Sequence, residues 1–148
     1  MVKQIILLLA IGLLMGACKG KGNNELLKAV TAGDMHKTAE ALEKGSDINA
    51  GDEKGFTALM LSAKSGHLEV VKFLIEKKAD LNAKNKSGRT ALMLAAMQIQ
   101  ESVVKALIEA GADVNIRNKE GEKTALTYAQ ESGHQGIIKI LEDAGGQE

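Results

Sequence analysis

Residues 55–87 read GFTALMLSAKSGHLEVVKFLIEKKADLNAKNKS, and residues 88–120 read GRTALMLAAMQIQESVVKALIEAGADVNIRNKE. The two stretches share one frame, which recurs every 33 residues, with glycine at Gly55, Gly88 and Gly121 and asparagine at Asn49, Asn82 and Asn115. A period of this size indicates a stack of small units, each of which buries its apolar side only against its neighbours. Such a stack has no built-in cleft, so the sequence favours binding along a surface over catalysis.

The composition fits one domain with a short additional segment. The chain has 148 residues, of which 45% are hydrophobic and only 2% aromatic, so aliphatic side chains must build the core. Lysine plus arginine and aspartate plus glutamate both number 19, so the chain lacks the clustered basic surface that nucleic-acid binding requires. The sequence contains no proline, so glycine, asparagine and aspartate must form the turns.

Each unit predicts two short helices followed by a loop. In the unit of residues 55–87 we expect helices at 57–64 and 68–77. Threonine is an acceptable N-cap and stands just before each apolar run, at Thr57, Thr90 and Thr124. Apolar residues of the second helix recur on one face, at Val70, Val71, Leu74 and Ile75 and again at Val103, Val104, Leu107 and Ile108. Gly66 suits the turn between the helices, and the segment KKADLNAKNKSG predicts a loop or hairpin.

The frame TALMLSAKSGHLEVVKFLIEKKADLNA, repeated as TALMLAA and VVKALIEAGADVNIRNKEG, resembles the ankyrin repeat. The resemblance covers residues 24–148, in units of about 24–54, 55–87, 88–120 and 121–148. It implies an all-α solenoid of about four helix-turn-helix units, with hairpin loops roughly perpendicular to the helices. It also implies that the concave side, made of hairpins and first helices, binds a partner protein.

The first helices depart from the family pattern at their N-termini. The family motif threonine-proline-leucine-histidine is replaced by TALM at 57–60 and 90–93, and by TALT at 124–127. Proline preorganises the first helical position, whereas alanine leaves the unfolded chain freer. We expect both replacements to weaken local rigidity without threatening the fold.

Two further places break the repeat. Lys37 and Thr38 take the positions of two core valines in the first unit, and polar residues there would keep an end unit soluble. Ile99 stands where the preceding unit has Gly66. A β-branched residue is disfavoured in the left-handed conformation that glycine adopts, so either the turn has another shape or strain is retained. We favour a reshaped turn.

The N-terminus has a different character from the repeats. Lys3 precedes the apolar run IILLLAIGLLM at 5–15, which is too short to span a bilayer comfortably. A charged start, a short apolar run and small residues at its end predict a signal peptide at 1–17. The residues LMGAC, which end at Cys18, resemble the lipobox of bacterial lipoproteins, although methionine stands where leucine is commonest.

The lipobox resemblance implies that Cys18 carries a lipid and that residues 18–23 include a flexible tether. The alternatives are a free thiol in an ordinary signal peptide and an uncleaved anchor. Lys19 is not the aspartate that marks inner-membrane retention in enteric bacteria. We therefore expect the protein in the bacterial cell envelope, anchored in the outer membrane and facing the periplasm.

The sequence contains no set of residues that predicts catalysis. The only cysteine is the proposed anchor, and a serine-histidine-acid set or a phosphate-binding glycine loop is not recognisable. Histidines are separated, at His36, His67 and His134, whereas metal sites need clustered ligands. The aspartates at Asp47, Asp80 and Asp113 are expected to accept hydrogen bonds from their own turns. We therefore expect no enzyme activity, cofactor, metal or small-molecule substrate.

Candidate binding residues are those that vary while the frame stays fixed. They lie at hairpin tips and at the ends of first helices, namely Phe56, Lys64, Arg89, Met97, Gln98 and Glu131. Aromatic residues, methionine and arginine are enriched in binding surfaces, so we expect a patch centred on Phe56, Arg89 and Met97. The prediction assumes that Phe56 and Met97 are exposed. The alternative is that Phe56 folds back onto its own hairpin.

Two functions fit these expectations. The first is an envelope-anchored adaptor, or scaffold, that holds a partner protein on the concave surface of hairpins and helices. The second is a periplasmic inhibitor or immunity protein that blocks a toxin or hydrolase. The sequence does not separate the two and does not identify the partner.

Overall fold

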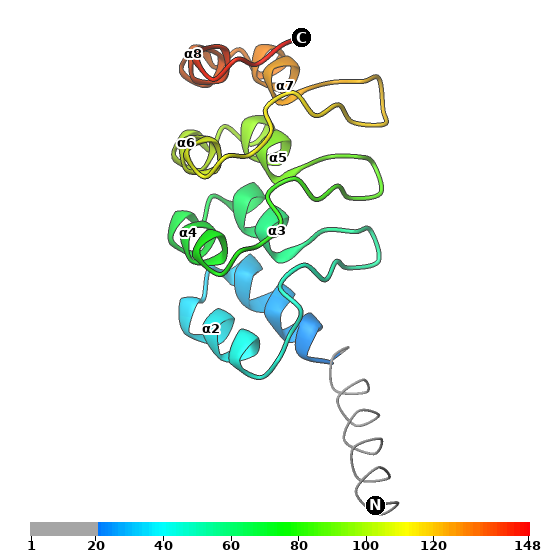
Figure 1. Cartoon of the computed structure of the whole chain (residues 1–148), viewed down its shortest axis with the longest axis vertical. Helices are drawn as coiled ribbons and strands as arrows, with labels where there is room; N and C mark the ends of the chain where they lie inside the picture. Colours follow the sequence, from blue (N-terminus) through cyan, green and yellow to red (C-terminus); the bar gives the residue numbers. More distant parts are fainter. Residues whose placement is uncertain (1–20) are drawn as a thin grey trace, which may run out of the picture.

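The computed structural model describes residues 21–148, which form four tiers of paired helices (Figure 1). The first tier pairs a helix at 21–32 with α2 (Met35–Glu43). The other tiers are α3 (Ala58–Ser65) with α4 (Leu68–Glu76), α5 (Ala91–Met97) with α6 (Glu101–Glu109), and α7 (Ala125–Ser132) with α8 (Gln135–Asp143). This part of the chain has no β-strand, only an isolated bridge between Gly51 and Thr57. The predicted all-α solenoid of four helix-turn-helix units is confirmed.

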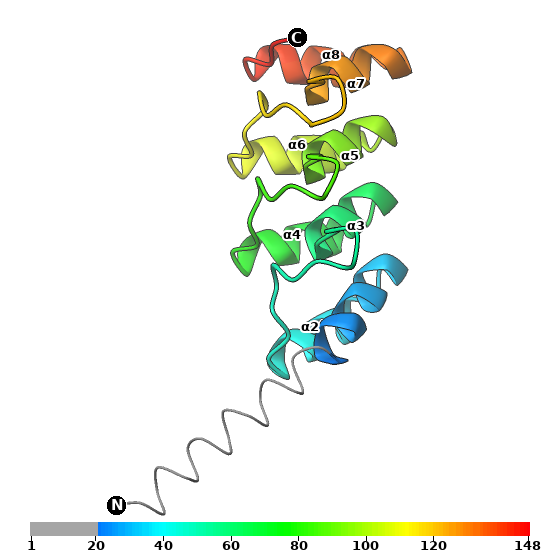
Figure 2. The same cartoon turned by 90° about the vertical axis from the view of Figure 1, so that its right-hand side faces the viewer.

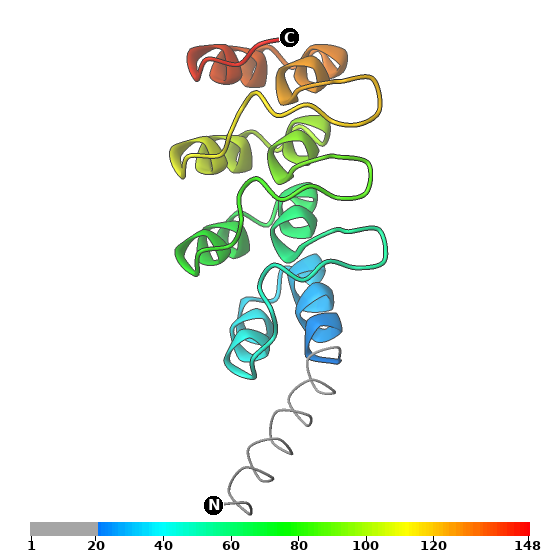
Figure 3. The same cartoon turned by 45° about the vertical axis from the view of Figure 1, so that its right-hand side comes forward.

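The helices form two columns, and the hairpin loops form a third layer. α3, α5 and α7 lie side by side in one column, and α4, α6 and α8 lie side by side in the other. The hairpins between tiers all project from the side of the α3, α5 and α7 column (Figures 1 and 3). The tiers follow one another along the long axis, with the helix at 21–32 and α2 at one end (Figure 2). Hairpins and first helices therefore share one continuous surface.

Threonine side chains begin the first helices of the last three tiers, as predicted. The hydroxyl oxygens of Thr57 and Thr90 accept the backbone N–H of Met60 and Met93 at 3.4 Å. Thr124 accepts the N–H of Thr127 at 3.3 Å in the same way. Each contact satisfies a backbone donor that has no partner within the helix, so the same residue sets the start of each helix.

The first tier begins earlier than the sequence predicts. Residues 21–23 are helical, so this part of the predicted tether at 18–23 is wrong. The physical reason is a contact with the following loop, where the Asn23 side-chain oxygen accepts the N–H of Asp47 at 2.8 Å. Cys18 and the predicted signal peptide at 1–17 lie outside the described residues.

The polar replacements in the first tier behave differently from each other. Lys37 is exposed, as expected for an end unit. Thr38 is fully buried, because its hydroxyl donates a 2.7 Å hydrogen bond to the carbonyl oxygen of Asp34. Threonine can occupy the place of a core valine here because the helix itself satisfies its hydroxyl.

Aliphatic side chains at equivalent positions form one continuous core. Leu74, Leu107 and Leu141 occupy the same place in α4, α6 and α8, and all three are fully buried. In the first tier, Leu26 and Val30 join the same core. Burial of this kind, roughly 1.5–3 kcal/mol for each large side chain, holds neighbouring tiers together.

Aspartate and asparagine side chains join successive tiers. Each aspartate accepts a 2.9 Å hydrogen bond from the N–H two residues on, in the pairs Asp47–Asn49, Asp80–Asn82 and Asp113–Asn115. This confirms that the aspartates bind their own turns. Each asparagine oxygen accepts an N–H of the following loop, from Asp80 at 2.8 Å, Asp113 at 2.9 Å and Gln147 at 2.8 Å. Neighbouring hairpins also bond directly, Lys86 N–H to Lys54 C=O and Lys119 N–H to Ser87 C=O, both at 3.0 Å.

The turn that contains Ile99 keeps the shape of the glycine turns. Its φ is 58°, close to the 75° of Gly66 and the 70° of Gly133. The predicted reshaped turn is therefore wrong, and the strained alternative is correct. The side chain remains 47% exposed, so burial of the isoleucine offsets little of the strain.

Replacing Ile99 by glycine should stabilise the protein. The left-handed conformation costs an L-residue roughly 1–2 kcal/mol, and the greater freedom of unfolded glycine offsets about 0.5–1 kcal/mol of that relief. We therefore expect a net gain of about 0.5–1 kcal/mol, visible as a melting temperature raised by a few degrees. Ile99→Ala is the control, because it keeps a Cβ atom. A melting temperature for Ile99→Gly at or below that of the parent would contradict the strain.

Candidate protein-binding surface

The candidate site is the surface formed by the hairpins and first helices, called the inner surface below. Two sets of repeated positions define it. The last hairpin residue before each capping threonine is Phe56, Arg89 or Lys123, and the last turn of each first helix carries Lys64, Met97 or Glu131. Because hairpins and helices recur in register, each hairpin residue stands near the helix end of its own tier.

In the second tier, the inner surface pairs an aromatic ring with a cation. The ammonium nitrogen of Lys64 lies 5.7 Å from the centre of the Phe56 ring, within range of a cation–π interaction. Two hydrogen bonds with Asp52 hold the Phe56 backbone, since Phe56 N–H donates to the Asp52 carboxylate at 2.9 Å and Asp52 N–H donates to the Phe56 carbonyl at 3.1 Å. These two bonds hold the backbone of this hairpin in one conformation.

Exposure of the two apolar candidates is lower than predicted. Phe56 and Met97 are both half-buried and pack against the core. The expectation that they are exposed is therefore wrong, because both side chains pack against the core. Beyond Met97, Gln98 is exposed, and Ile99 is the apolar residue that projects into solvent.

In the third and fourth tiers, the inner surface carries two ion pairs whose cations both lie near one tyrosine ring. Arg89 donates to the Glu120 carboxylate at 2.7 Å, and its guanidinium carbon lies 5.9 Å from the centre of the Tyr128 ring. Lys123 donates to Glu131 at 2.5 Å and lies 5.7 Å from the same ring. The hydrogen bond to Glu131 raises the pKa of the Lys123 amine. Arg89 and Lys123 thus both have carboxylate partners.

Tyr128 is the residue that the sequence interpretation missed. Its ring is buried, and its hydroxyl accepts a 2.7 Å hydrogen bond from the side-chain amide of Asn118 in the hairpin. The signal was available, because the chain has a single tyrosine and it replaces Leu61 and Leu94 of the preceding units. Tyrosine at this position supplies an aromatic ring with which two cations can form cation–π interactions.

The six predicted site residues thus fall into three groups. Phe56 and Lys64 contact each other. Arg89 and Glu131 are linked through Lys123 and Tyr128. Met97 and Gln98 stand at the end of α5, between these groups in the stack. Phe56 and Arg89 thus have different partners within the chain, and the patch centred on Phe56, Arg89 and Met97 stays a prediction.

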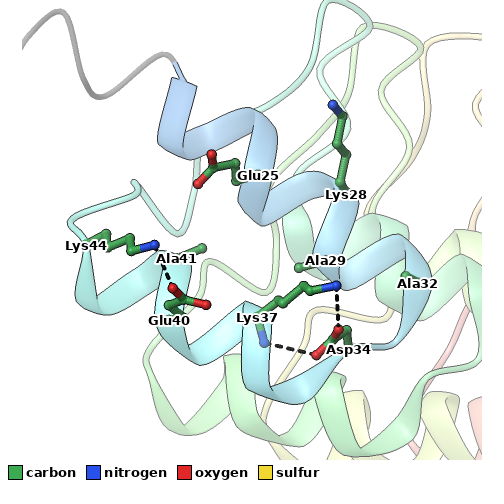
Figure 4. A pocket seen from close by; sticks show the side chains of 9 residues that line it. All are labelled: Glu25, Lys28, Ala29, Ala32, Asp34, Lys37, Glu40, Ala41 and Lys44. Atoms are coloured by element: carbon green, nitrogen blue, oxygen red, sulfur yellow. Dashed lines mark hydrogen bonds and ion pairs between the residues drawn. The ribbon is translucent and has the colours of Figure 1, made fainter.

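The first tier also has a cleft of about 470 Å³ between the helix at 21–32 and α2 (Figure 4). Ala29 and Ala41 lie among its lining residues, and charged side chains surround them. The N–H of Lys37 lowers the pKa of the Asp34 carboxyl, and the hydrogen bond from Lys44 lowers that of Glu40 (Figure 4). These are exposed pairs along one helix, which contribute little to stability. The cleft gathers no combination of groups suited to catalysis.

Two further observations concern residues 21–148 as a whole. No group of three or more histidine, cysteine, aspartate or glutamate side chains in this range is arranged to hold a metal ion. In the same range, no helix combines the length and the apolar character needed to cross a bilayer.

Comparison with known proteins gives one result that bears on the whole stack. A family model described as ankyrin repeats in three copies matches residues 14–118 and, in a second match, residues 83–147. Together the two matches span all four tiers. A search of curated proteins returned no match.

Proposed function

The chain belongs to the ankyrin-repeat family, and from this premise we propose that it is an adaptor anchored to the bacterial cell envelope, holding one partner protein on its inner surface. Ankyrin repeats are protein–protein interaction modules, so the family itself indicates that this chain binds another protein. The location, the lipid anchor and the single partner are the parts that are proposed.

The observation that supports this proposal is the preorganisation of the inner surface. Backbone bonds between hairpins fix their spacing, and Arg89 and Lys123 are already held by carboxylates and by the Tyr128 ring. Side chains that are ordered before binding lose less conformational entropy when a partner docks. Affinity can then come from a stiff surface without a chemical step.

The anchor is supported by the sequence LMGAC that ends at Cys18. A lipid at this residue would concentrate the domain at a membrane surface, and stable anchoring takes two or more acyl chains. The first tier is the one nearest to Cys18 in the sequence, so the inner surface would extend away from the anchor along the stack.

Replacing Cys18 by serine should abolish lipid attachment. The serine hydroxyl cannot form the thioether that lipoprotein modification requires, so incorporation of a labelled fatty acid should be lost, and the protein should leave the membrane fraction. The matched control is the Lys19→Ser variant, which keeps Cys18 and should still be labelled. Unchanged labelling and fractionation of Cys18→Ser would contradict the anchor.

Binding on the inner surface can be tested with a photo-crosslinking residue at Gln98, which is exposed at the end of α5. In envelope membranes this position should crosslink to one protein, whereas the same residue at Lys72, exposed on α4, should not. Alanine at Phe56, Arg89 and Met97 together should weaken binding of that protein by about tenfold or more.

The matched control for these alanines is Phe73→Ala, since Phe73 also lies under a lysine, Lys77, at 5.5 Å but on a second helix. Equal crosslinking from Gln98 and Lys72, or equal losses in the two alanine variants, would contradict the proposed surface. If the crosslinked protein is a toxin or hydrolase that loses activity when bound, the protein is an inhibitor and not an adaptor.

A further inference from the structure

Two neighbouring hairpins of the inner surface carry opposite charge at equivalent positions. The tip of the hairpin at 47–57 contains Asp52, Glu53 and Lys54, whereas the tip of the hairpin at 80–90 contains Lys84 and Lys86 and no carboxylate. All five side chains are exposed. The two hairpins are in direct contact, because the Lys86 N–H donates to the Lys54 carbonyl at 3.0 Å. A negative tip and a positive tip therefore lie side by side.

The other hairpin charges do not remove this contrast. The aspartates that bind their own turns recur in all three hairpins, so they add the same charge to each. The hairpin at 113–124 repeats the two lysines as Arg117 and Lys119 but also carries Glu120 and Glu122, so it is nearly balanced. The strongest difference in charge is therefore between the hairpins at 47–57 and 80–90.

Opposite charges pair elsewhere on the inner surface but not between these two tips. Arg89 and Lys123 both bind carboxylates, with N–O distances of 2.7 and 2.5 Å. Within residues 21–148, Glu53, Lys84 and Lys86 form no ion pair, although the two hairpins are bonded to each other through their backbones. The charges of both tips are therefore available to a docking protein.

From this charge order we infer that the partner protein docks with a basic segment on the hairpin at 47–57 and an acidic segment on the hairpin at 80–90. In this direction each segment meets charges of opposite sign, whereas reversed docking would bring like charges together. The charge order thus sets the direction in which the partner lies along the stack. Exposed charges of this kind act mainly on orientation and on the rate of association. This inference rests on the proposed function.

The first test uses the full chain in envelope membranes, with a photo-crosslinking residue at Lys54 in one variant and at Ser87 in another. Both should crosslink to the same protein. Mass spectrometry should place the crosslink from Lys54 in a segment of that protein rich in Lys and Arg, and the crosslink from Ser87 in a segment rich in Asp and Glu. Segments of the same charge at both positions, or the reverse order, would overturn the inference.

The second test exchanges charges between the two tips and keeps the net charge. Glu53→Lys combined with Lys86→Glu should lower the yield of the crosslink from Gln98 by about tenfold. The loss should shrink as salt is added, because exposed charges are screened. The charge-matched control is Lys139→Glu combined with Glu142→Lys, both exposed on α8, which should crosslink like the parent chain. Circular dichroism establishes that both variants are folded.

The remaining outcomes separate this inference from the proposed function. An unchanged crosslink from Gln98 in the exchanged variant, or an equal loss in the α8 control, overturns the inference and leaves the proposed function standing. If the parent chain gives no crosslink from Gln98, and Lys54 and Ser87 give none either, the proposed function fails and this inference fails with it.

Discussion

Replacing Gly88 by alanine should destabilise the protein by about 1.5–4 kcal/mol. Gly88 has a φ of 76°, and a Cβ atom there would lie 2.7 Å from the backbone nitrogen of Lys119. The left-handed conformation contributes roughly 1–2 kcal/mol of this loss, and the forced contact with backbone contributes about 1–3 kcal/mol more. The reduced freedom of the unfolded alanine chain offsets about 0.5–1 kcal/mol of the sum. The neighbouring hairpin cannot move away cheaply, because its Lys119 N–H donates to the Ser87 carbonyl at 3.0 Å.

Gly121 provides a matched control for this prediction. It occupies the same register position one unit later, with a φ of 84°, but a Cβ atom there would meet nothing within 4 Å. Gly121→Ala should therefore lose only the conformational part, about 1–2 kcal/mol, less about 0.5–1 kcal/mol because alanine makes the unfolded chain less free. Urea denaturation followed by circular dichroism gives both free energies of unfolding. Equal losses in the two variants would show that hairpin spacing is not fixed by backbone contact.

The repeat makes most of the fold predictable, because each unit uses the same capping residues and the same buried positions. A threonine before an apolar run needs only local chemistry to cap a helix, so Thr57, Thr90 and Thr124 were identified correctly. Asp80 binds its own turn for the same local reason. Features that depend on residues within four positions of each other can be read directly from a single sequence.

The failures arose where one tier acts on another. Composition favoured a tether at 18–23, but residues 21–23 are helical, with Asn23 bonded to a loop 24 residues later. Ile99 looked incompatible with a glycine turn, but the tiers on either side impose the same geometry on it. Stacking energy summed over several contacts exceeds the cost of one strained residue, and a local rule cannot include that sum.

The candidate site was predictable in position but not in pairing. Register alone places Arg89 and Lys123 at the same point of successive hairpins. It does not reveal that Arg89 pairs with Glu120, 31 residues away, or that both cations lie near the Tyr128 ring. Those pairings depend on side-chain rotamers, which the register of the repeat does not specify.

Leu107→Ala should cause the largest loss from a change within the core, about 2–5 kcal/mol. Leu107 is fully buried in α6, which packs between α4 and α8. Truncation removes apolar burial and leaves a cavity that the neighbouring helices fill only in part. Because a stack is held by nearest-neighbour contacts, a defect in an internal tier weakens both of its interfaces. Urea denaturation should show a lower midpoint for the whole domain.

Two variants separate this effect from a local one. Leu107→Met keeps the volume and should cost less than about 1.5 kcal/mol. Leu141→Ala removes the equivalent leucine of α8, which contacts α6 and α7 but has no further tier beyond it among the described residues. Hydrogen exchange should then show protection lost mainly in α7 and α8, whereas Leu107→Ala should reduce protection on both sides of α6. The same protection pattern in both alanine variants would mean that the four tiers unfold as one unit, and the nearest-neighbour account of the stack would be wrong.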